Sequence, residues 1–202
     1  SEPFTGAWQK NIAATNKESL LSSSAVYACV TGIASDIAKM PIKLVENDEG
    51  IWNEITEPHG NSTESVALNL LHRPNLFQTR LKFVEQWMVS KLLYGNTYVL
   101  KERDARGDII ALYILHPLCV EVLVAEDGSI FYKPKRDYLS QISDEMADVA
   151  IPESEIIHDM MVALWHPLVG ISPIYACGMA ATMGNKIQAN STNLFANASR
   201  PG

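Results

Sequence analysis

Apolar residues recur at helical spacing in three parts of the chain, and each recurrence is bounded by residues that start or stop a helix. Over residues 25–39 the stripe follows a run of serines and ends before Pro41. A shorter stripe over residues 66–71 ends before Pro74, and a third runs over residues 79–95 to a terminal glycine. This period predicts three amphipathic helices. The third, which also carries bulky aromatic residues, is expected to be the spine of the domain.

Between and after these helices, pairs of short apolar segments flank turn-forming residues. The pairs are 42–44 with 51–55 around 47–50, 97–101 with 109–115 around 104–107, and 120–124 with 130–133 around 127–128. Such segments, bounded by Gly, Asn and Asp, predict hairpins, so the sheet should be mainly antiparallel. The run 109–115 is apolar throughout, which predicts burial on both of its faces.

A different pattern follows in the last part of the sequence. Ser172 with Pro173 is a typical helix start, because serine caps the first turn and proline at the first helical position loses no hydrogen bond. The next proline is Pro201, which allows a helix of about 40 Å at 1.5 Å per residue. The predicted organisation is a flexible arm over 1–24, an α+β domain over 25–171 and a long projecting helix over 172–202.

The predicted long helix is almost free of charge, with Lys186 and Arg200 as its basic residues and no acidic residue. One side is apolar and includes Met183, Ile187 and Leu194. Such a helix is either packed in the core of its own domain or buried between copies of the same chain. The near absence of charge fits the second alternative at least as well as the first.

Composition excludes a disordered chain, because 47% of the 202 residues are hydrophobic. The net charge of −7 comes from one segment, since seven acidic residues and no lysine or arginine lie between Arg136 and Lys186. The remaining 16 acidic residues balance the 16 basic ones. Proteins that grip nucleic-acid phosphates carry a basic stripe, so a conventional nucleic-acid binder is not expected. Residues 137–150 should form a polar, mobile excursion, with order resuming at Glu155.

Cys29, Cys119 and Cys177 are far apart and show no Cys-x-x-Cys spacing, which argues against a zinc site or a disulfide framework. We expect buried free thiols in a reducing compartment. No charged and then apolar leader opens the sequence, and no apolar run approaches the roughly 18 residues that span a bilayer. The expectation is a soluble protein of intracellular origin, without a membrane partner or a cofactor.

The residues that most resemble a reactive site are His158 and Asp159, with Glu153, Glu155 and His166 nearby in the sequence. A histidine beside carboxylates can transfer protons or hold a metal ion. However, no His-Glu-x-x-His, Gly-x-Ser-x-Gly or glycine-rich phosphate motif accompanies them. A solvated acidic loop with a structural histidine is therefore favoured, and no catalytic, cofactor or metal site is predicted.

Gly95, Asn96 and Thr97 offer a second alternative, because successive backbone amides can form a nest for an anion. They follow a predicted helix C-terminus, which is the negative end of the helix dipole and the wrong end for a phosphate. A left-handed helix cap at Gly95 is therefore the favoured interpretation.

Four blocks of residues occur in order along the chain. They are 25–41; Leu70, Leu71, Pro74, Asn75, Thr79 and Phe83; 93–98 with Asp104, Gly107, Leu112 and Pro117; and 155–158 with 170–173, 195–197, Pro201 and Gly202. No block is specific alone. The ordered series resembles the portal proteins of tailed bacteriophages, in particular the HK97-type portal family. Members of that family are considerably longer, so the chain is expected to represent the N-terminal wing region and the helix leading into the stem.

The resemblance implies a subunit of a ring, usually of twelve copies, at one capsid vertex of the virion, assembled in the host cytoplasm. DNA enters through such a ring, driven by a terminase, and leaves through it toward the tail. The implied partners are other copies of the chain, the major capsid protein, the terminase large subunit, a head–tail adaptor and double-stranded DNA that passes without sequence specificity.

In such a ring, Met183, Ile187 and Leu194 are candidate subunit-interface residues, and Lys186 and Arg200 are candidate contacts for DNA phosphates. Two other classes remain open from the residues alone. One is a generic α+β scaffold or adaptor module, and the other is an α+β hydrolase that uses His158. The missing catalytic motifs favour a protein without enzymatic turnover.

Overall fold

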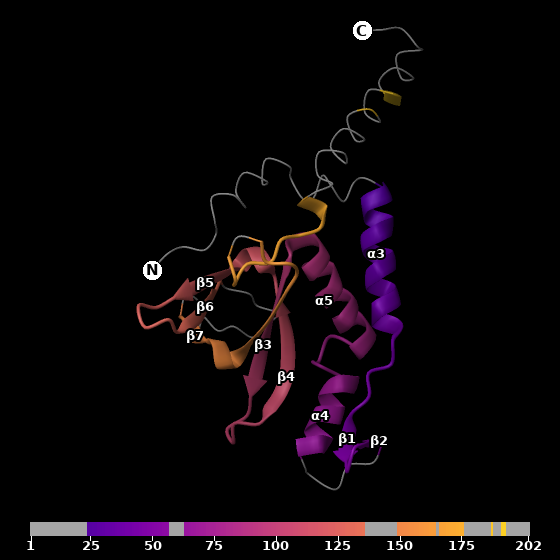
Figure 1. The fold of residues 1–202 in the computed structure, drawn as a ribbon, viewed down its shortest axis with the longest axis vertical. Helices are drawn as coiled ribbons and strands as arrows, with labels where there is room; N and C mark the ends of the chain where they lie inside the picture. Colours follow the sequence, from indigo (N-terminus) through magenta and orange to yellow (C-terminus); the bar gives the residue numbers. More distant parts are fainter. Residues whose placement is uncertain are drawn as a thin grey trace.

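The computed structural model describes residues 24–56, 63–135, 149–164 and 166–175, together with 187, 191 and 192. Within these residues the chain forms three helices and three small antiparallel sheets, which confirms the predicted α+β class (Figure 1). The predicted arm over 1–24, apart from its last residue, and most of the excursion over 137–150 lie outside the described residues. Most of the predicted long helix also lies outside them.

The three predicted helices are present, as α3 (Ser24–Lys39), α4 (Thr63–His72) and α5 (Arg80–Tyr94). Val30 of α3 packs with Leu92 and Leu93 of α5 in a small core of their own, and the two helices lie side by side in Figure 1. The guanidinium of Arg80 donates to the Met40 carbonyl at 2.8 Å, which ties the start of α5 to the end of α3.

The eight strands pair as hairpins or as neighbours that lie far apart in the sequence. Their bounds are β1 (Val45–Asp48), β2 (Ile51–Glu54), β3 (Asn96–Arg103), β4 (Ile109–Leu115), β5 (Val120–Val124), β6 (Ile130–Pro134), β7 (Ile151–Pro152) and β8 (Ile156–Met160). The sheet orders are β1-β2, β4-β3-β8 and β5-β6-β7. All pairs are antiparallel, which confirms the three predicted hairpins and adds β7 and β8 at sheet edges.

The β4-β3-β8 sheet is the centre of the domain, and its two faces have different neighbours. One face joins the β5-β6-β7 sheet in the main core; its buried members are Tyr98, Leu100, Ala111, Tyr113, Leu115, Val120, Val122, Tyr132, Ile151 and Ile156. The other face turns toward α4 and α5. Val99 on that face is fully buried, whereas Leu112 and Ile157 beside it are only half-buried.

Two sequence predictions about burial are corrected by this arrangement. Strand β4 was expected to be buried on both faces, but only alternate residues are buried and Ile110 is 53% exposed. The reason is that the helices cover only part of the second face of the sheet. Free thiols were expected inside, yet Cys29 is exposed and Cys119 is half-buried. Cys177 lies outside the described residues.

The acidic segment after residue 149 is more ordered than predicted. Strand β7 precedes Glu155, and its Ile151 is buried against Tyr132 of β6. A short 3-10 turn (Glu153–Glu155) then leads directly into β8. The buried side chains of Ile151 and Ile156 therefore hold the end of a segment whose acidic composition had indicated a solvated loop. Among the described residues, no helix combines the length and hydropathy that crossing a membrane requires.

Candidate functional site: the junction at Asn96

A close crossing of two backbone segments lies where α5 passes into β3. Gly95 takes the left-handed conformation with φ 78°, and its N–H caps the helix by donating to the Lys91 carbonyl at 2.9 Å. This confirms the predicted cap. A Cβ on Gly95 would meet the Gly170 carbonyl and would lie 2.6 Å from the Ser172 nitrogen. A Cβ on Gly170 would likewise lie 2.7 Å from the Met161 nitrogen. Both glycines are therefore required for the segment around Gly170 to approach the α5–β3 turn.

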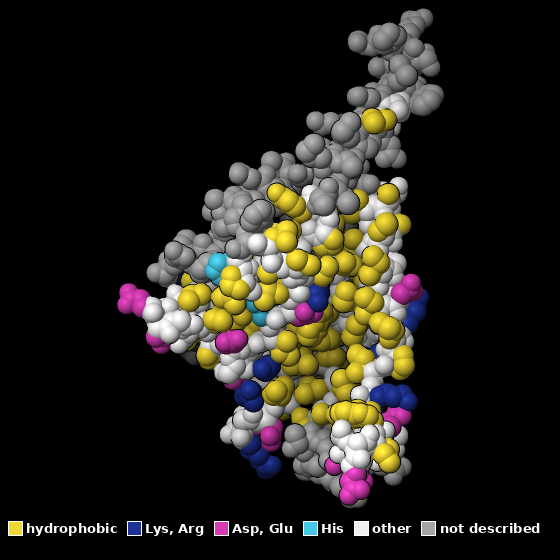
Figure 2. Space-filling model, in the orientation of Figure 1, with side chains coloured by type: hydrophobic (Ala, Val, Ile, Leu, Met, Phe, Trp, Pro, Cys, Tyr) yellow, Lys and Arg dark blue, Asp and Glu magenta, His cyan; other side chains and the backbone are white. Residues whose placement is uncertain are grey.

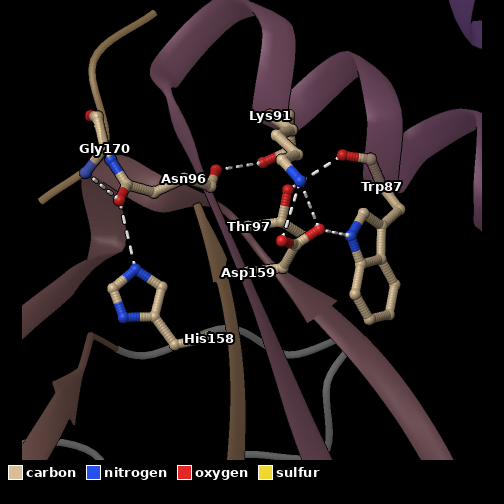
Figure 3. Close-up of polar contacts among 8 residues, drawn as sticks. Trp87, Lys91, Asn96, Thr97, His158, Asp159 and Gly170 are labelled. Atoms are coloured by element: carbon tan, nitrogen blue, oxygen red, sulfur yellow. Dashed lines mark hydrogen bonds and ion pairs between the residues drawn. The ribbon is translucent and has the colours of Figure 1, made fainter. Parts of the chain in front are cut away.

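The side chain of Asn96 joins that segment to β3, as Figure 3 shows. Its Nδ2 donates to the Gly170 carbonyl at 3.0 Å, and its Oδ1 accepts from the Gly170 N–H at 2.9 Å. The amide thus pairs with both backbone groups of Gly170 as a neighbouring strand would. Asn96 is only 5% exposed, and a buried amide that lacked these partners would be costly.

His158 completes the junction from β8, and its partners define which ring nitrogen carries hydrogen. Its Nε2 lies 3.1 Å from Asn96 Oδ1, which is already an acceptor, so Nε2 is the donor. Its Nδ1 then accepts from the Tyr132 hydroxyl at 3.1 Å. The ring also stacks on Tyr98, with centroids 4.4 Å apart. This geometry holds a neutral imidazole with both nitrogens in use.

Burial reinforces that protonation state. Desolvation lowers the pKa of His158 to about 4, against a smaller upward effect of Asp159. Desolvation likewise raises the pKa of Tyr132 to about 12, with the charge of Glu153 as a smaller contribution. Near neutral pH the cluster is therefore uncharged, and its hydrogen bonds are those of a structural element.

Asp159 points to the opposite side of β8 from His158, because successive strand residues alternate. Its carboxylate contacts Lys91 Nζ at 2.8 Å and accepts from Trp87 Nε1 at 2.8 Å, both from α5 (Figure 3). Thr97, which is fully buried, donates to the Trp87 carbonyl at 2.8 Å. Helix α5 is thus fixed to β3 and β8 by polar contacts along its C-terminal half.

The segment after Gly170 is anchored in the same place. Ser172 Oγ donates to the Leu92 carbonyl at 2.6 Å and accepts from the Ile174 N–H at 3.2 Å. The serine therefore caps a new helical turn, as predicted, while it also binds a free carbonyl at the end of α5. Hydrogen bonds at the junction thus join α5, β3, β8 and the helical turn that follows Ser172.

The acidic residues near His158 do not form a reactive cluster. Glu155 pairs with Arg103 Nε at 2.7 Å, and that hydrogen bond lowers the pKa of its carboxyl below the usual value. Asp159 pairs with Lys91, so the predicted solvated loop is wrong for these residues, although the structural role of His158 is as predicted. Within the described ranges, no group of histidine, cysteine and carboxylate side chains could hold a metal ion.

The candidate interface and DNA-contact residues lie in the C-terminal segment, away from this junction in sequence. Ile187 is helical and 62% exposed. Met183, Leu194, Lys186 and Arg200 fall outside the described residues. The junction itself was missed at the level of the sequence because its central contact joins residues 74 positions apart. The one available signal was the pair of glycines in the third and fourth resemblance blocks.

Comparison with known proteins connects this fold to a family. The model of the family described as "Phage portal protein" matches residues 24–202. The chain belongs to the phage portal protein family. This membership places it among structural proteins rather than enzymes.

Related sequences include the portal protein of Enterobacteria phage HK97. It is 27% identical over 185 residues, which cover 92% of this chain and 40% of that protein. Uncharacterized proteins of Rickettsia bellii and Rickettsia felis are 27% and 26% identical, each over 87% of this chain and 42% of their own length. The chain thus spans less than half the length of the curated relatives it matches.

Solved structures with the same fold come from gene transfer agent (GTA) particles. A chain in the neck of an empty particle, computed with C6 symmetry, superimposes with a TM-score of 0.75 at 21% identity. The match covers 100% of this chain and 50% of that chain. A chain in the neck of the native particle, computed with C12 symmetry, gives a TM-score of 0.72 at 21% identity, over 99% of this chain and 48% of the other.

Proposed function

We propose that this chain is the wing part of a portal subunit that assembles into a ring at one vertex of a capsid. The ring serves as the channel for genome packaging and ejection and connects the head to the tail. The observation that carries the proposal is the family match over residues 24–202. Its solved relatives, which share the fold, come from particle necks computed with C6 and C12 symmetry, which supports a symmetric ring for this chain as well.

The junction at Asn96 gives the proposal a structural role for the described residues. A ring that guides DNA needs each subunit to hold the helix that follows the wing in a fixed direction. Gly170 and Ser172 are locked to the α5–β3 turn immediately before the helical turn at residues 174–175. We propose that the wing thereby sets where the predicted helix over 173–199 starts and the direction in which it leaves the domain.

That helix is proposed to project toward the stem and to be buried against its counterparts in the ring. Ile187 is an apolar side chain that is 62% exposed in the single chain, and burial by a partner would remove it from water. Met183 and Leu194 share its side of the predicted helix. Lys186 and Arg200 are proposed to make transient contacts with DNA phosphates, without sequence specificity.

The remaining proposed partners follow from the same role. The major capsid protein surrounds the ring, the terminase large subunit docks during packaging, and a head–tail adaptor binds afterwards. The proposed location is the portal vertex of the virion, after assembly in the host cytoplasm. The described residues do not favour a second function, because His158 has both ring nitrogens engaged in structural hydrogen bonds.

The test is the mass of the full-length protein that carries this chain, measured by native mass spectrometry or light scattering. A closed assembly of many subunits is expected. A stable monomer, or an open filament without closure, would refute the proposal.

The proposed interface of the long helix is tested separately, with Ile187→Asp and Leu194→Asp in the full-length protein. Loss of the ring with a folded wing is expected. Unchanged ring formation would show that this side of the helix is not a contact between subunits.

A further inference from the structure

The second face of the central sheet carries a groove that no other described segment fills. The groove has a volume of about 580 Å³, and its surface is almost entirely apolar. Its lining includes Leu70, Arg80, Trp87, Met88, Leu112 and Ile157. We call it the α4–α5 groove. Figure 2 shows hydrophobic side chains gathered over the middle of this face, between the strands and α3.

The groove belongs to neither of the two cores of the described chain. Leu70, Met88, Leu112 and Ile157 are half-buried, and none of them is a member of the main core or of the α3–α5 core. Arg80, the charged residue of the lining, is engaged with the Met40 carbonyl. An open apolar surface of this kind in a soluble protein indicates a docking site rather than a solvated face.

Helix α3 presents a second surface that no other described element covers. This surface is convex, whereas the groove is concave. Its outward residues Ala25, Ala28, Cys29, Gly32 and Ile33 are all exposed. We call them the α3 outer face. A helix that faces water normally carries charges there, but this side is uncharged from Ala25 to Ile33, and the exposed pair Asp36 and Lys39 follows on the same side in the last turn. No α3 residue lines the groove, so the two surfaces are separate parts of the molecule.

We infer that the α4–α5 groove of one subunit receives the α3 outer face of the next subunit. This inference rests on the proposed ring and specifies its contact. A rotationally closed ring needs two different complementary surfaces on each subunit, since a heterologous contact joins one to the other. The described chain offers a concave apolar surface and a convex one that is uncharged from Ala25 to Ile33, which suits the packing of a helix in a groove.

The composition of the α3 outer face explains how the helix enters the groove. Small residues let a helix backbone approach closely, while Ile33, 47% exposed, projects from its flank. Gly32 is the clearest mark of this role, because no atom of the subunit lies within 4 Å of a Cβ built there. Glycine in a helix interior lowers helix stability, and no contact among the described residues requires it here. A neighbouring subunit supplies the close contact that does.

Cysteine cross-linking in the full-length ring tests the inference, because Cys29 already lies on the α3 outer face. In a background with Cys119→Ser and Cys177→Ser, the substitution Met88→Cys places a second thiol in the groove. Oxidation of the assembled ring should produce a ladder of covalently linked subunits, which disappears when Cys29→Ala is added. A matched control, Asp127→Cys on the β5–β6 turn, should give no ladder.

An intact ring that yields only monomers, or a disulfide within one subunit, would overturn the inference while the proposed ring stands. A wild-type protein that forms no closed assembly would overturn both. A second variant, Gly32→Leu, removes the need for an engineered thiol. Its fold should be unchanged, because the site is open in the subunit, and its assembled fraction should fall at least tenfold. Equal assembly of Gly32→Leu and wild type would contradict the contact.

Discussion

The two halves of α5 face very different surroundings. The C-terminal half is enclosed: Ser90, Leu92 and Leu93 are buried, and the helix is bonded to β3, β8 and Ser172. The N-terminal half, which carries Val84, borders an apolar groove that extends to Met88 and that no other described segment fills. The C-terminal end of α5 is covered by other parts of the same chain, whereas we infer that the apolar surface beside its N-terminal end is covered by another subunit.

The difference shows how polarity distinguishes an internal joint from an assembly surface. In the described chain, no buried side-chain nitrogen or oxygen lacks a hydrogen bond, and the junction accounts for many of these bonds. Directional bonds of this kind fix angles and cannot be remade elsewhere. The groove and the α3 outer face offer almost no directional bonds, and their exposure to water is unfavourable, so the free energy gained when another subunit covers them can drive assembly.

Gly95→Ala should have the largest effect on the enclosed end. Alanine at φ 78° is strained, and its Cβ would collide with the backbone at Gly170 and Ser172. We expect a loss of about 4 kcal/mol or more in the free energy of unfolding, measured by urea denaturation.

The matched control is Gly107→Ala. Gly107 has φ 91° but open space around it, so the cost should be about 1 kcal/mol. Equal losses in the two variants would show that the crossing of Gly95 and Gly170 is not a tight contact.

Asn96→Ala should be the next largest change. It removes both partners of the Gly170 backbone and leaves His158 Nε2 without its acceptor. The expected loss is about 2–4 kcal/mol in denaturant unfolding, since buried polar groups are left unpaired. Asn53→Ala on the exposed β2 strand is the control and should change stability by less than about 0.5 kcal/mol. A small effect of Asn96→Ala would mean that the amide does not hold the segment.

His158 makes the enclosed end sensitive to acid, and the sign follows from its lowered pKa. Between pH 6.5 and about 4 the unfolded chain binds a proton that the folded chain does not, so stability should fall as the pH falls. The stability that the neutral imidazole contributes is fully present above pH 6.5. About 1–2 kcal/mol of it should be lost as the pH falls from 6.5 to 5. The measurement is the difference in unfolding free energy between wild type and His158→Gln across this range. A difference that does not change with pH would contradict the neutral, buried imidazole.

Substitutions in the open groove should have the smallest effect on the single chain. Leu70→Gln and Met88→Gln replace half-buried side chains that touch no core cluster, so each should cost less than about 1 kcal/mol. The same variants should reduce assembly of the full-length protein, seen by size-exclusion chromatography with light scattering. A large loss of monomer stability without loss of assembly would reverse the distinction between the two ends of α5.

The sequence predicted the elements of this fold well, because their boundaries are local. Pro41, Pro74 and Gly95 end helices where expected, and Gly107 and Gly128 turn the hairpins with positive φ. Local chemistry of this kind needs no knowledge of distant partners.

The junction could not be predicted in the same way. Asn96 looked like part of a helix cap, yet it is the first residue of β3 and pairs with Gly170. Asp159 looked solvated, yet it is bonded to Lys91 and Trp87. Both outcomes depend on β8 lying beside β3, a pairing of segments about 60 residues apart that no local pattern indicates. The open groove was missed for the same reason, since apolar periodicity shows that a face is covered but not by which chain.

Hydroxyl-radical footprinting of the full-length protein, as isolated subunits and as assembled rings, tests the central distinction most directly. Trp87 and Met88 in the groove, and Cys29 on the α3 outer face, carry side chains that such radicals oxidise readily. Their oxidation should drop together on assembly, whereas the buried Tyr98 and Tyr132 should stay unreactive in both states. Unchanged oxidation of Trp87, Met88 and Cys29 in the ring would show that these surfaces are not where one subunit meets the next.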